Sequence, residues 1–471
     1  MSNDPKNLAA LAKLANPKFP DPFGNDFAPA VLVHREFEQL AQGSGNPVPC
    51  VVGISRPDGT CSRFALNLLP EGHPQASLNA PLVERVVKFL LWQRGGNKVL
   101  IGGPSSVAEY VADRYSVGGE QAFDVGMMGQ TMFAADFEVV SCTPEEVPAE
   151  TSDAKLIGRN LEGNRIGFDL GASDRKVAAV VDGVSIWSEE VDWDPRGNSD
   201  PSYHLAEIRN AINSAAEKMD SVDAIGGSSA GVIINNQVMV ASLFRGVPQE
   251  KYDAVRDAFL TIASEYGVPL EVANDGDVTA LAGAMSLDQN AVLGIAMGSS
   301  EAAGYVDGNG HITGWLNELA FAPIDYAATA PADEWSEDIG CGVQYLTQQA
   351  VFRLAQPAGI DISGTDQLAE KLRIVQRELE AGNAEARKIW RAIGIYCGYA
   401  IAHYAQFYGI EHMLILGRVT SGQGGTIIIE TAREVLASEF PELADSISVN
   451  LPDEKTRRVG QAVAAASLPK A

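Results

Sequence analysis

The chain has 471 residues, 46% of them hydrophobic, and a formal net charge of −26 at pH 7. This length predicts two or three domains with ample apolar residues for their cores. The acidic balance argues against nucleic acid and against an anionic membrane as partners, because both require a basic surface. Because no apolar stretch approaches a membrane span and the N-terminus lacks a signal-peptide pattern, we expect a soluble cytoplasmic protein.

Residues 1–150 predict an N-terminal α/β extension whose role the sequence does not identify. Residues 1–30 are rich in Pro, Asn and Asp and are expected to wrap the surface. Val83–Trp92 has a helical apolar pattern, residues 98–106 indicate a strand, a glycine turn and a helix start, and residues 137–142 indicate a strand. Residues 143–163 have the composition of a linker.

Strands and helices alternate from residue 164 onward, which is typical of an α/β fold. The sequence predicts helices near 202–219, 249–266, 342–355, 364–381, 384–408 and 425–439. It predicts strands at 166–170, 177–181, 223–226, 270–273, 291–296 and 412–416.

The segment Asp169-Leu-Gly-Ala-Ser173 carries the most chemical information. An apolar strand ends on Asp169 and turns through Gly171 and Ser173 before a second strand begins. Such a hairpin can hold backbone N–H groups and a hydroxyl against a phosphate, with the carboxylate near a Mg²⁺ ion. The alternative interpretation is an exposed turn that happens to carry a carboxylate.

Four further motifs follow in order. Residues 223–231 indicate a strand entering a glycine-rich turn, and a buried strand delivers Asn274 and Asp275 to a helix start. Residues 293–305 make a second Ser/Gly-rich hairpin, and residues 412–422 run from a strand into a glycine turn. Together they predict a cleft for a nucleotide and a small alcohol. Asn274 and Asp275 could instead only cap a helix, which both residue types favour.

The ordered set resembles the ROK sugar-kinase family of the hexokinase/actin-like superfamily, over residues 164–471. The matching segments are Asp169-Leu-Gly-Ala-Ser173, Asn274-Asp275, Gly298-Ser-Ser-Glu-Ala-Ala-Gly304, Glu318-Leu-Ala-Phe321 and Leu416-Gly-Arg-Val419. The resemblance implies a two-lobed actin-like ATPase (ribonuclease H-like) fold, preceded by the extra N-terminal α/β segment. Its lobes would span residues 164–285 and 286–471.

The resemblance also implies roles for individual residues. Asp275 would be the general base that deprotonates a sugar hydroxyl for attack on the γ-phosphate of ATP. Asn274 and Glu318 would bind the sugar, with Gly227 as a backbone contact. Asp169 would act through Mg²⁺. The remaining nucleotide contacts would be Gly171, Ser173, Gly298, Ser299, Gly304, Gly417 and Arg418.

Several residues depart from the family pattern. Phe321 stands where many members carry a histidine, and Cys341 is the one cysteine in the region of their zinc cluster, so we expect no structural zinc. Ala172 and Arg418 replace glycines of the nucleotide loops. Glu301 adds a negative charge that would either repel a triphosphate or point to solvent.

Two functions are therefore open. The first is an ATP- and Mg²⁺-dependent sugar kinase, and the second is a non-catalytic sugar- or nucleotide-binding sensor or scaffold with a degenerate kinase site. The N-terminal third has no evident helix-turn-helix, so DNA binding is not expected. It would cover the cleft or make a dimer contact, and the resemblance implies a homodimer.

Overall fold

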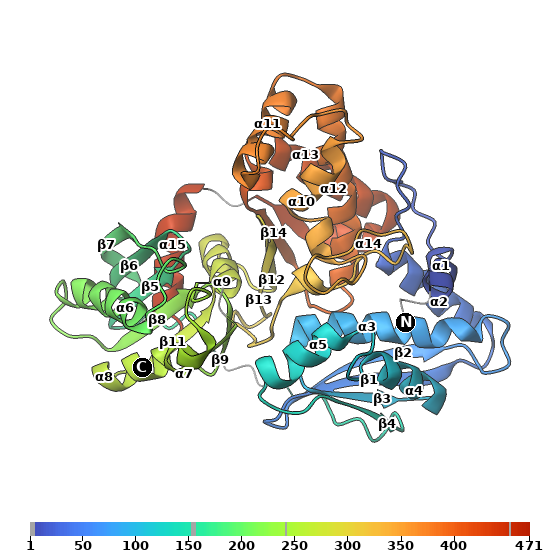
Figure 1. Ribbon diagram of the computed structural model, residues 1–471, viewed down its shortest axis with the longest axis horizontal. Helices are drawn as coiled ribbons and strands as arrows, with labels where there is room; N and C mark the ends of the chain where they lie inside the picture. The colour runs from blue at the N-terminus through green and yellow to red at the C-terminus, as the bar shows by residue number, and fades with distance from the viewer. Residues whose placement is uncertain (1–4, 152–156, 241–242, 452–453) are drawn as a thin grey trace.

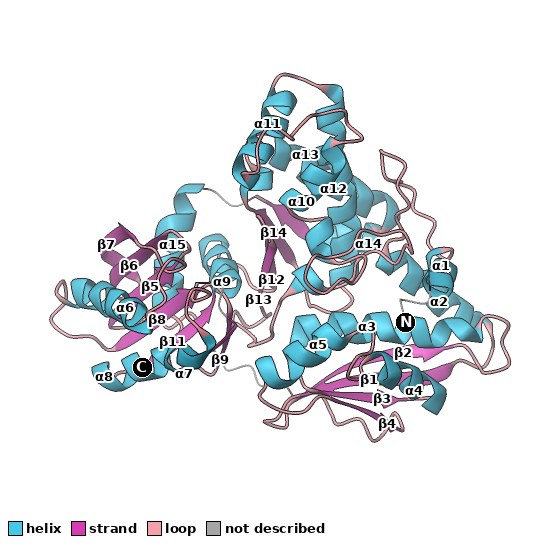
Figure 2. Cartoon of the chain, viewed as in Figure 1, coloured by secondary structure: helices cyan, strands magenta, loops and turns pink. Residues whose placement is uncertain are grey.

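The computed structural model describes residues 5–151, 157–240, 243–451 and 454–471. The chain forms two lobes of an α/β fold and an N-terminal segment that lies beside the second lobe (Figure 1). Figure 2 shows that each of the three bodies is built around its own sheet, with helices packed against it. Among the described residues no helix is both long and apolar enough to cross a membrane.

The N-terminal segment contains a four-stranded sheet in the order β2-β1-β3-β4. Only β3 and β4 run parallel. Its elements are α1 (Pro5–Ala12), α2 (Ala30–Gly43), β1 (Val48–Ser55), β2 (Cys61–Leu68), α3 (Asn79–Arg94), β3 (Lys98–Gly102), α4 (Ser105–Arg114), α5 (Ala122–Gly126) and β4 (Glu138–Cys142). The predicted helix over residues 83–92 and the predicted strands at 98 and 137 are confirmed within longer elements. The sequence reading missed the β1–β2 hairpin.

The first lobe is built on a five-stranded sheet in the order β11-β8-β5-β6-β7. Strands β5, β8 and β11 are parallel, while β6 and β7 extend the sheet as an antiparallel meander. Its elements are β5 (Asn164–Leu170), β6 (Asp174–Val181), β7 (Val184–Asp192), α6 (Pro201–Ala216), β8 (Ala224–Ser229), β9 (Val232–Ile234), β10 (Gln237–Val240), α7 (Tyr252–Arg256), α8 (Ala258–Tyr266) and β11 (Leu270–Asn274).

The second lobe is built on a sheet in the order β13-β12-β14-β15, in which β12, β14 and β15 are parallel. Helix α9, between the two sheets in sequence, contacts strands of both. The elements from α9 onward are α9 (Asp275–Leu287), β12 (Val292–Met297), β13 (Glu301–Val306), α10 (Gln348–Ala355), α11 (Leu368–Glu380), α12 (Ala384–Tyr404), β14 (His412–Leu416), α13 (Gln423–Glu439), α14 (Pro441–Ser446), β15 (Ser448–Asn450) and α15 (Glu454–Ala466).

The last helix corrects the predicted lobe boundary. Helix α15 packs on β5 and β8 of the first lobe and on α9, although the sequence predicts it within a second lobe of residues 286–471 (Figure 1). Gly167 and Gly226 make this contact possible, because a Cβ at either position would lie within 2 Å of the carbonyl oxygen of Ala462 or Ala465. The first lobe therefore includes the C-terminal helix as well as the residues from β5 to β11.

The glycine-rich turn predicted for residues 223–231 is also wrong in part. Gly226 and Gly227 lie inside β8, which continues to Ser229. A Cβ at Gly227 would lie 2.3 Å from the ring of Phe168, so this glycine makes room for a core side chain. This position does not support the predicted substrate contact at Gly227.

Two predicted helices begin or break elsewhere. The helix predicted over 249–266 divides into α7 and α8, because Asp257 leaves the helical conformation. The helix predicted to begin at residue 342 begins at Gln348, since Thr347 provides its N-cap by accepting the Gln349 N–H. The remaining predicted helices and strands of both lobes are confirmed to within a few residues at each end.

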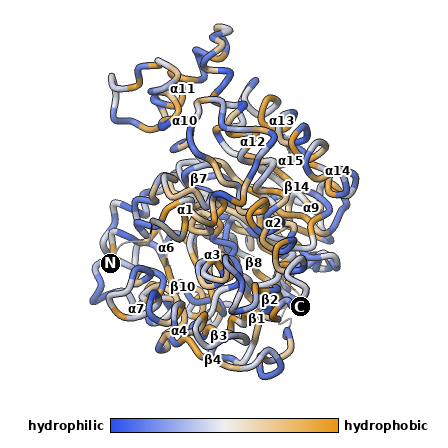
Figure 3. The backbone as a smooth tube through the Cα atoms, turned by 90° about the vertical axis from the view of Figure 1, so that its right-hand side faces the viewer, coloured by the Kyte–Doolittle hydropathy of each residue, from blue (hydrophilic) through white to orange (hydrophobic). Residues whose placement is uncertain are grey.

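The N-terminal segment and the second lobe share one hydrophobic core. The ring of Phe89 in α3 stacks on that of Phe407, which follows α12, with centroids 4.0 Å apart. Figure 3 shows hydrophobic residues gathered toward the middle of the molecule and hydrophilic residues along the outlying loops. The segment is thus packed against the second lobe through a continuous core.

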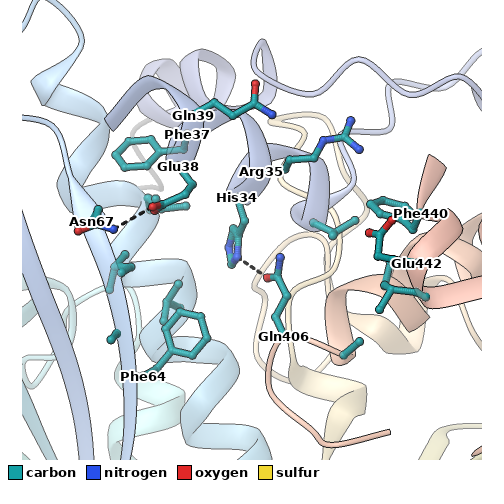
Figure 4. Close-up of a pocket in the computed structure, with 18 residues that line it drawn as sticks. His34, Arg35, Phe37, Glu38, Gln39, Phe64, Asn67, Gln406, Phe440 and Glu442 are labelled. Atoms are coloured by element: carbon teal, nitrogen blue, oxygen red, sulfur yellow. Dashed lines mark hydrogen bonds between the residues drawn. The ribbon is translucent and has the colours of Figure 1, made fainter. Parts of the chain in front are cut away.

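A cavity of about 520 Å³ remains along this seam between α2, β2, α12 and α14. Figure 4 shows its polar contacts, in which His34 bonds Gln406 and the Asn67 amide donates to Glu38. Its walls are mostly apolar, and burial lowers the pKa of His34 to about 4, so this imidazole is neutral. Among the described residues that line it, none belongs to the predicted site.

Candidate active site

Two of the predicted site residues, Asp169 and Asn274, and the unpredicted Ser228 lie at or near the carboxyl ends of three adjacent parallel strands. Asp169 is near the end of β5, Ser228 near the end of β8, and Asn274 at the end of β11. Ligands of open α/β sheets bind at this edge, because the polar ends of the strands and helix N-termini meet there. The sheet therefore gathers residues that are 59 and 105 positions from Asp169 in the sequence.

Asp169 is 8% exposed and is held from two sides. The Ser228 hydroxyl donates to its Oδ1 atom at 2.6 Å, and Lys176 Nζ lies 3.8 Å from its Oδ2 atom. Burial raises the pKa of this carboxyl, while the Ser228 hydrogen bond and Lys176 lower it. The sequence reading missed Lys176, although its place two residues after Asp174 in β6 puts it opposite Asp169 in the strand register.

Asn274 fixes the start of α9 with both ends of its side chain. Its Oδ1 accepts the Gly276 N–H at 2.7 Å, as an N-cap residue does, and its Nδ2 donates to Gly231 O at 2.7 Å. The capping interpretation of Asn274 is thus correct. The same contacts fix the following residue, Asp275, at the N-terminus of α9.

Asp275 is the first residue of α9, and it is partly exposed. Its Oδ1 accepts the Gly276 N–H at 3.0 Å. Burial raises the pKa of Asp275 to about 6, with a further contribution from the negative charge of Asp169. The two carboxylates singled out in the sequence are therefore close enough to repel each other.

Glu318 joins the same acidic group from the second lobe. Burial, and after it the negative charges of Asp275 and Asp277, raise the pKa of Glu318 to about 7. Its backbone N–H donates to Trp92 O at 3.0 Å, and the preceding Asn317 N–H donates to Gln93 O. The C-terminal end of α3 thus holds the loop that carries Glu318.

Asp277 is a buried residue of the site that the sequence reading missed. Its Oδ1 accepts from the Asn317 amide at 2.9 Å and from the Tyr305 N–H at 3.2 Å. Burial raises the pKa of Asp277 to about 7. Asn274-Asp-Gly-Asp277 was visible in the sequence, and the i, i+2 spacing of the aspartates was the available signal.

Both predicted phosphate hairpins have exposed tips. In the first, Ala172 and Ser173 are exposed, while the Gly171 N–H donates to Asp174 O at 2.9 Å. In the second, Ser299 is exposed and the Gly298 N–H donates to Ser300 O at 3.0 Å. The tips offer the exposed hydroxyl groups of Ser173 and Ser299, which are of the kind that bind phosphate oxygens, while the Gly171 and Gly298 N–H groups bond within their own turns.

The two predicted nucleotide-contact glycines Gly417 and Gly304 lie in different structural settings. Gly417 follows β14 with φ 103°, and a Cβ there would lie 2.5 Å from Met297 O, so this turn lies against the end of β12 beside Gly298. Arg418 is exposed next to it. Gly304, in contrast, lies within β13, where a Cβ would be 2.2 Å from Gly276 O of α9. The prediction that Gly304 belongs to the phosphate loop is therefore wrong, because this glycine makes room for the helix.

Glu301 neither faces a triphosphate loop nor points to solvent, contrary to both expectations. It is 2% exposed, and Tyr404 Oη donates to its Oε1 at 3.3 Å. Its Oε2 has no hydrogen-bond partner among the residues that the structure describes, and a Cβ at Gly342 would lie 2.3 Å from it. Because burial raises the pKa of Glu301 to about 8, the carboxyl is mostly protonated at neutral pH.

Phe321 and Cys341 lie where the N-terminal segment docks on the second lobe. Phe321 stacks on Trp92 of α3, and buried Cys341 lies next to Asp338. Asp338 pairs with Arg85 at 3.0 Å and Lys88 at 3.1 Å. Across the described ranges there is no group of three or more His, Cys, Asp or Glu side chains arranged to hold a metal ion.

The chain was compared with known proteins by sequence and by structure. No protein-family model and no curated protein matches the sequence. Solved structures do match. The ROK hexokinase of Thermus thermophilus is similar with a TM-score of 0.50 and 17% identity, over 64% of this chain and 97% of that one. A ROK glucokinase of Streptomyces griseus, in complex with glucose and AMPPNP, is similar with a TM-score of 0.45 and 19% identity, over 64% and 99%.

The fold is therefore the two-lobed actin-like ATPase fold of the ROK proteins, as the sequence predicted. It occupies about two thirds of the chain, and the N-terminal α/β segment is additional to it. At this level of identity the likeness concerns the fold, so activity has to be argued from the site itself.

Proposed function

We propose that this chain is a kinase that transfers the γ-phosphoryl group of ATP to a hydroxyl of a sugar-like acceptor. The observation that carries the proposal is the position of Asp275 at the N-terminus of α9, with a pKa of about 6 and Asp169 nearby. A general base works best when its pKa lies near the operating pH, because it is then ionised and still accepts a proton.

In the proposed reaction, Asp275 accepts the proton of the acceptor hydroxyl while that oxygen attacks the γ-phosphorus. The bond to the β–γ bridging oxygen breaks and ADP leaves. Asn274 fixes the helix start that aims Asp275, and Glu318 hydrogen-bonds another acceptor hydroxyl. The exposed tips at Ser173 and Ser299, with Gly171, Gly298 and Gly417, contact the phosphates, and Arg418 lies on the adenosine side.

Asp169 is the residue that would hold a Mg²⁺ ion in this proposal. The carboxylate of Asp169 lies near the carboxyl end of β5, and proteins bind Mg²⁺ with one or two carboxylates together with substrate phosphates. The ion would neutralise charge on the phosphates when bound. Lys176, 3.8 Å from Asp169, supplies a second positive charge at the same place.

The second candidate is a non-catalytic sugar- or nucleotide-binding protein. It is favoured by Arg418 and by Ala172, which stand where the resembled loops have glycine. The burial and protonation of Glu301 weaken it, because the expected repulsion of a triphosphate does not arise from a neutral side chain. We therefore rank the kinase first.

A direct test is phosphoryl transfer from Mg²⁺-ATP across a panel of hexoses, amino sugars and polyols. We expect turnover with one acceptor class and a loss of at least about 100-fold in Asp275→Asn. The matched control is Asp253→Asn, whose carboxylate is on the surface of α7. Turnover that survives in Asp275→Asn would remove Asp275 as the base, and binding of sugar without any turnover would favour the non-catalytic candidate.

A further inference from the structure

Asn317, the residue before Glu318, connects three parts of the chain. Its backbone N–H donates to Gln93 O at 3.0 Å, at the end of α3 in the N-terminal segment. Its Nδ2 donates to Asp277 Oδ1 in α9 at 2.9 Å, and its Oδ1 accepts from the Tyr408 hydroxyl, which follows α12, at 2.9 Å. Asn317 is 2% exposed, so these bonds form away from water. A single buried residue therefore joins the N-terminal segment, the second lobe and α9.

The end of α3 depends on this loop. The last four carbonyl groups of an α-helix have no partner within the helix. In α3, the Trp92 and Gln93 carbonyls accept the N–H groups of Glu318 and Asn317, both at 3.0 Å. Trp92 and Gln93 are fully buried, and a buried carbonyl that loses its hydrogen bond destabilises the fold. The end of α3 therefore fixes the backbone of residues 317 and 318.

The backbone conformation of Asn317 allows all these contacts at once. Its φ is 51°, in the left-handed region that Asn adopts more readily than most other side chains. A turn with one residue in this region aims successive N–H groups in the same direction. Both N–H groups therefore reach the end of α3, and the amide of Asn317 is left for Asp277.

Asp277 carries the connection on to the proposed base. It lies two residues after Asp275, in the first turn of α9. Its Oδ1 also accepts the Tyr305 N–H of β13 at 3.2 Å, so this turn is held from two sides. Glu318 is close enough to Asp275 for the charge of Asp275 to contribute to its raised pKa. The distance between these two carboxyl groups therefore depends on where the Asn317–Asp277 bond holds α9 against the loop.

We infer that Asn317 is a positioning residue through which the N-terminal segment sets the spacing between Asp275 and Glu318. The inference rests on the proposed function, in which Asp275 is the base and Glu318 binds the acceptor. A reacting group that is misplaced by about 1 Å can cost about 100-fold in rate, so loss of the bond should be visible in the kinetics.

The test variant is Asn317→Gly, because glycine adopts φ 51° without strain and only the side-chain bonds are removed. The matched control is Asn235→Gly, at the exposed tip of the β9–β10 hairpin, where φ is 52°. A swap variant combines Asp277→Asn with Asn317→Asp. It exchanges the two side chains, so that an amide and a carboxylate face each other again.

The first measurement is amide hydrogen exchange of the full chain without ligand, followed by mass spectrometry. Exchange in the first turn of α9, residues 275–279, should be about tenfold faster in Asn317→Gly, because two buried hydrogen bonds are lost. Asn235→Gly should leave this exchange unchanged, and the swap variant should restore most of the protection. Unchanged exchange in Asn317→Gly, or an equal increase in Asn235→Gly, would overturn the inference.

The second measurement is the kinetics of phosphoryl transfer. Asn317→Gly should lower kcat about 10- to 100-fold, raise KM for the acceptor and leave KM for ATP unchanged. The swap variant should recover most of kcat. A lower kcat with both KM values unchanged would indicate only a loss of folded protein, and that result or an unchanged kcat would overturn the inference. If the unaltered chain turned over no acceptor, the proposed kinase activity would be contradicted, whereas faster exchange in Asn317→Gly alone would still support the positioning of α9 by Asn317.

Discussion

The ring of Phe321 stacks on the ring of Trp92, with centroids 4.2 Å apart and planes inclined at 29°. The contact joins the loop that carries Glu318 to α3 of the N-terminal segment. Two backbone hydrogen bonds, from Asn317 and Glu318 to carbonyls of α3, reinforce it. The segment that the sequence left without a role therefore supports an acidic residue of the proposed site.

The first prediction concerns Trp92. Its side chain is fully buried, and its indole N–H donates to Asp124 at 3.0 Å. Trp92→Ala should lower the free energy of unfolding by about 3–5 kcal/mol, because it leaves a large cavity under Phe321. Urea unfolding checks this value. Trp335→Ala, at a 75% exposed position, should change it by less than about 0.5 kcal/mol. Similar effects of the two changes would show that α3 does not support the loop.

The second prediction concerns the buried ion cluster beneath this contact. Lys88 pairs with Asp124 at 2.9 Å and with Asp338 at 3.1 Å, and all three side chains are at most 3% exposed. Lys88→Met should cost about 3–5 kcal/mol of stability, since it leaves Asp124 buried without its cation and Asp338 with Arg85 alone.

The comparison is with Lys388→Met, which breaks an exposed pair with Glu385 of similar length. That change should cost less than about 1 kcal/mol. Both variants are compared by urea unfolding at one pH and ionic strength. If Lys88→Met were as mild as Lys388→Met, the N-terminal segment would not depend on the cluster for its docking.

The sequence predicted the two-lobed α/β fold and the strands that carry Asp169 and Asn274, because the strands follow from local patterns and the fold from the order of the motifs. Asp169 and Asn274 end apolar strands, and parallel strands bring such ends together. It could not predict where Glu301 points. A strand's first residue faces one side or the other according to register, and the register of β13 is set by its pairing with β12 and by α9.

Glycines were the least predictable residues. Gly226, Gly227 and Gly304 suggested turns and loops, since glycine favours both. Each lies within a strand where a helix backbone or an aromatic ring approaches closely. Such contacts join residues far apart in sequence, for example Gly226 and Ala465, and a local motif carries no information about them. The docking of α3 on Phe321 was hidden for the same reason.

The third prediction is a pH dependence of stability that arises from Glu301. Its pKa is about 8 in the folded chain against a usual 4.5, chiefly because of burial and further because of Glu318. Below the pKa of Glu301 in the unfolded chain, the carboxyl is protonated in both states and its burial carries no ionisation penalty. As the pH rises from that value toward the pKa of the folded chain, only the unfolded chain releases the proton, so the folded chain loses stability. Between pH 4.5 and 8 the loss could reach about 5 kcal/mol.

Glu301→Gln keeps the shape of the protonated side chain and cannot ionise. Urea unfolding at pH 5, 6.5 and 8 should therefore show a smaller fall in stability with pH than in the unaltered chain. Glu434→Gln, at an exposed position on α13, serves as the control and should leave the pH dependence unchanged. The same slope in Glu301→Gln and in the unaltered chain would mean that Glu301 does not carry the effect.

The fourth prediction is the pH profile of the proposed reaction. Asp275 must be ionised to accept a proton, and its pKa is raised to about 6 by burial and by Asp169. The value of kcat/KM should therefore be constant above about pH 7, fall through a midpoint near 6, and drop about tenfold per pH unit below it.

The Asp275→Asn variant should lack this acidic fall in kcat/KM and retain its melting temperature within a few degrees, because Asn keeps the size of the side chain. Asp253→Asn should reproduce the profile of the unaltered chain. A flat profile between pH 5 and 7, with activity intact in Asp275→Asn, would assign the proton transfer to another member of the acidic group, with Glu318 the next candidate.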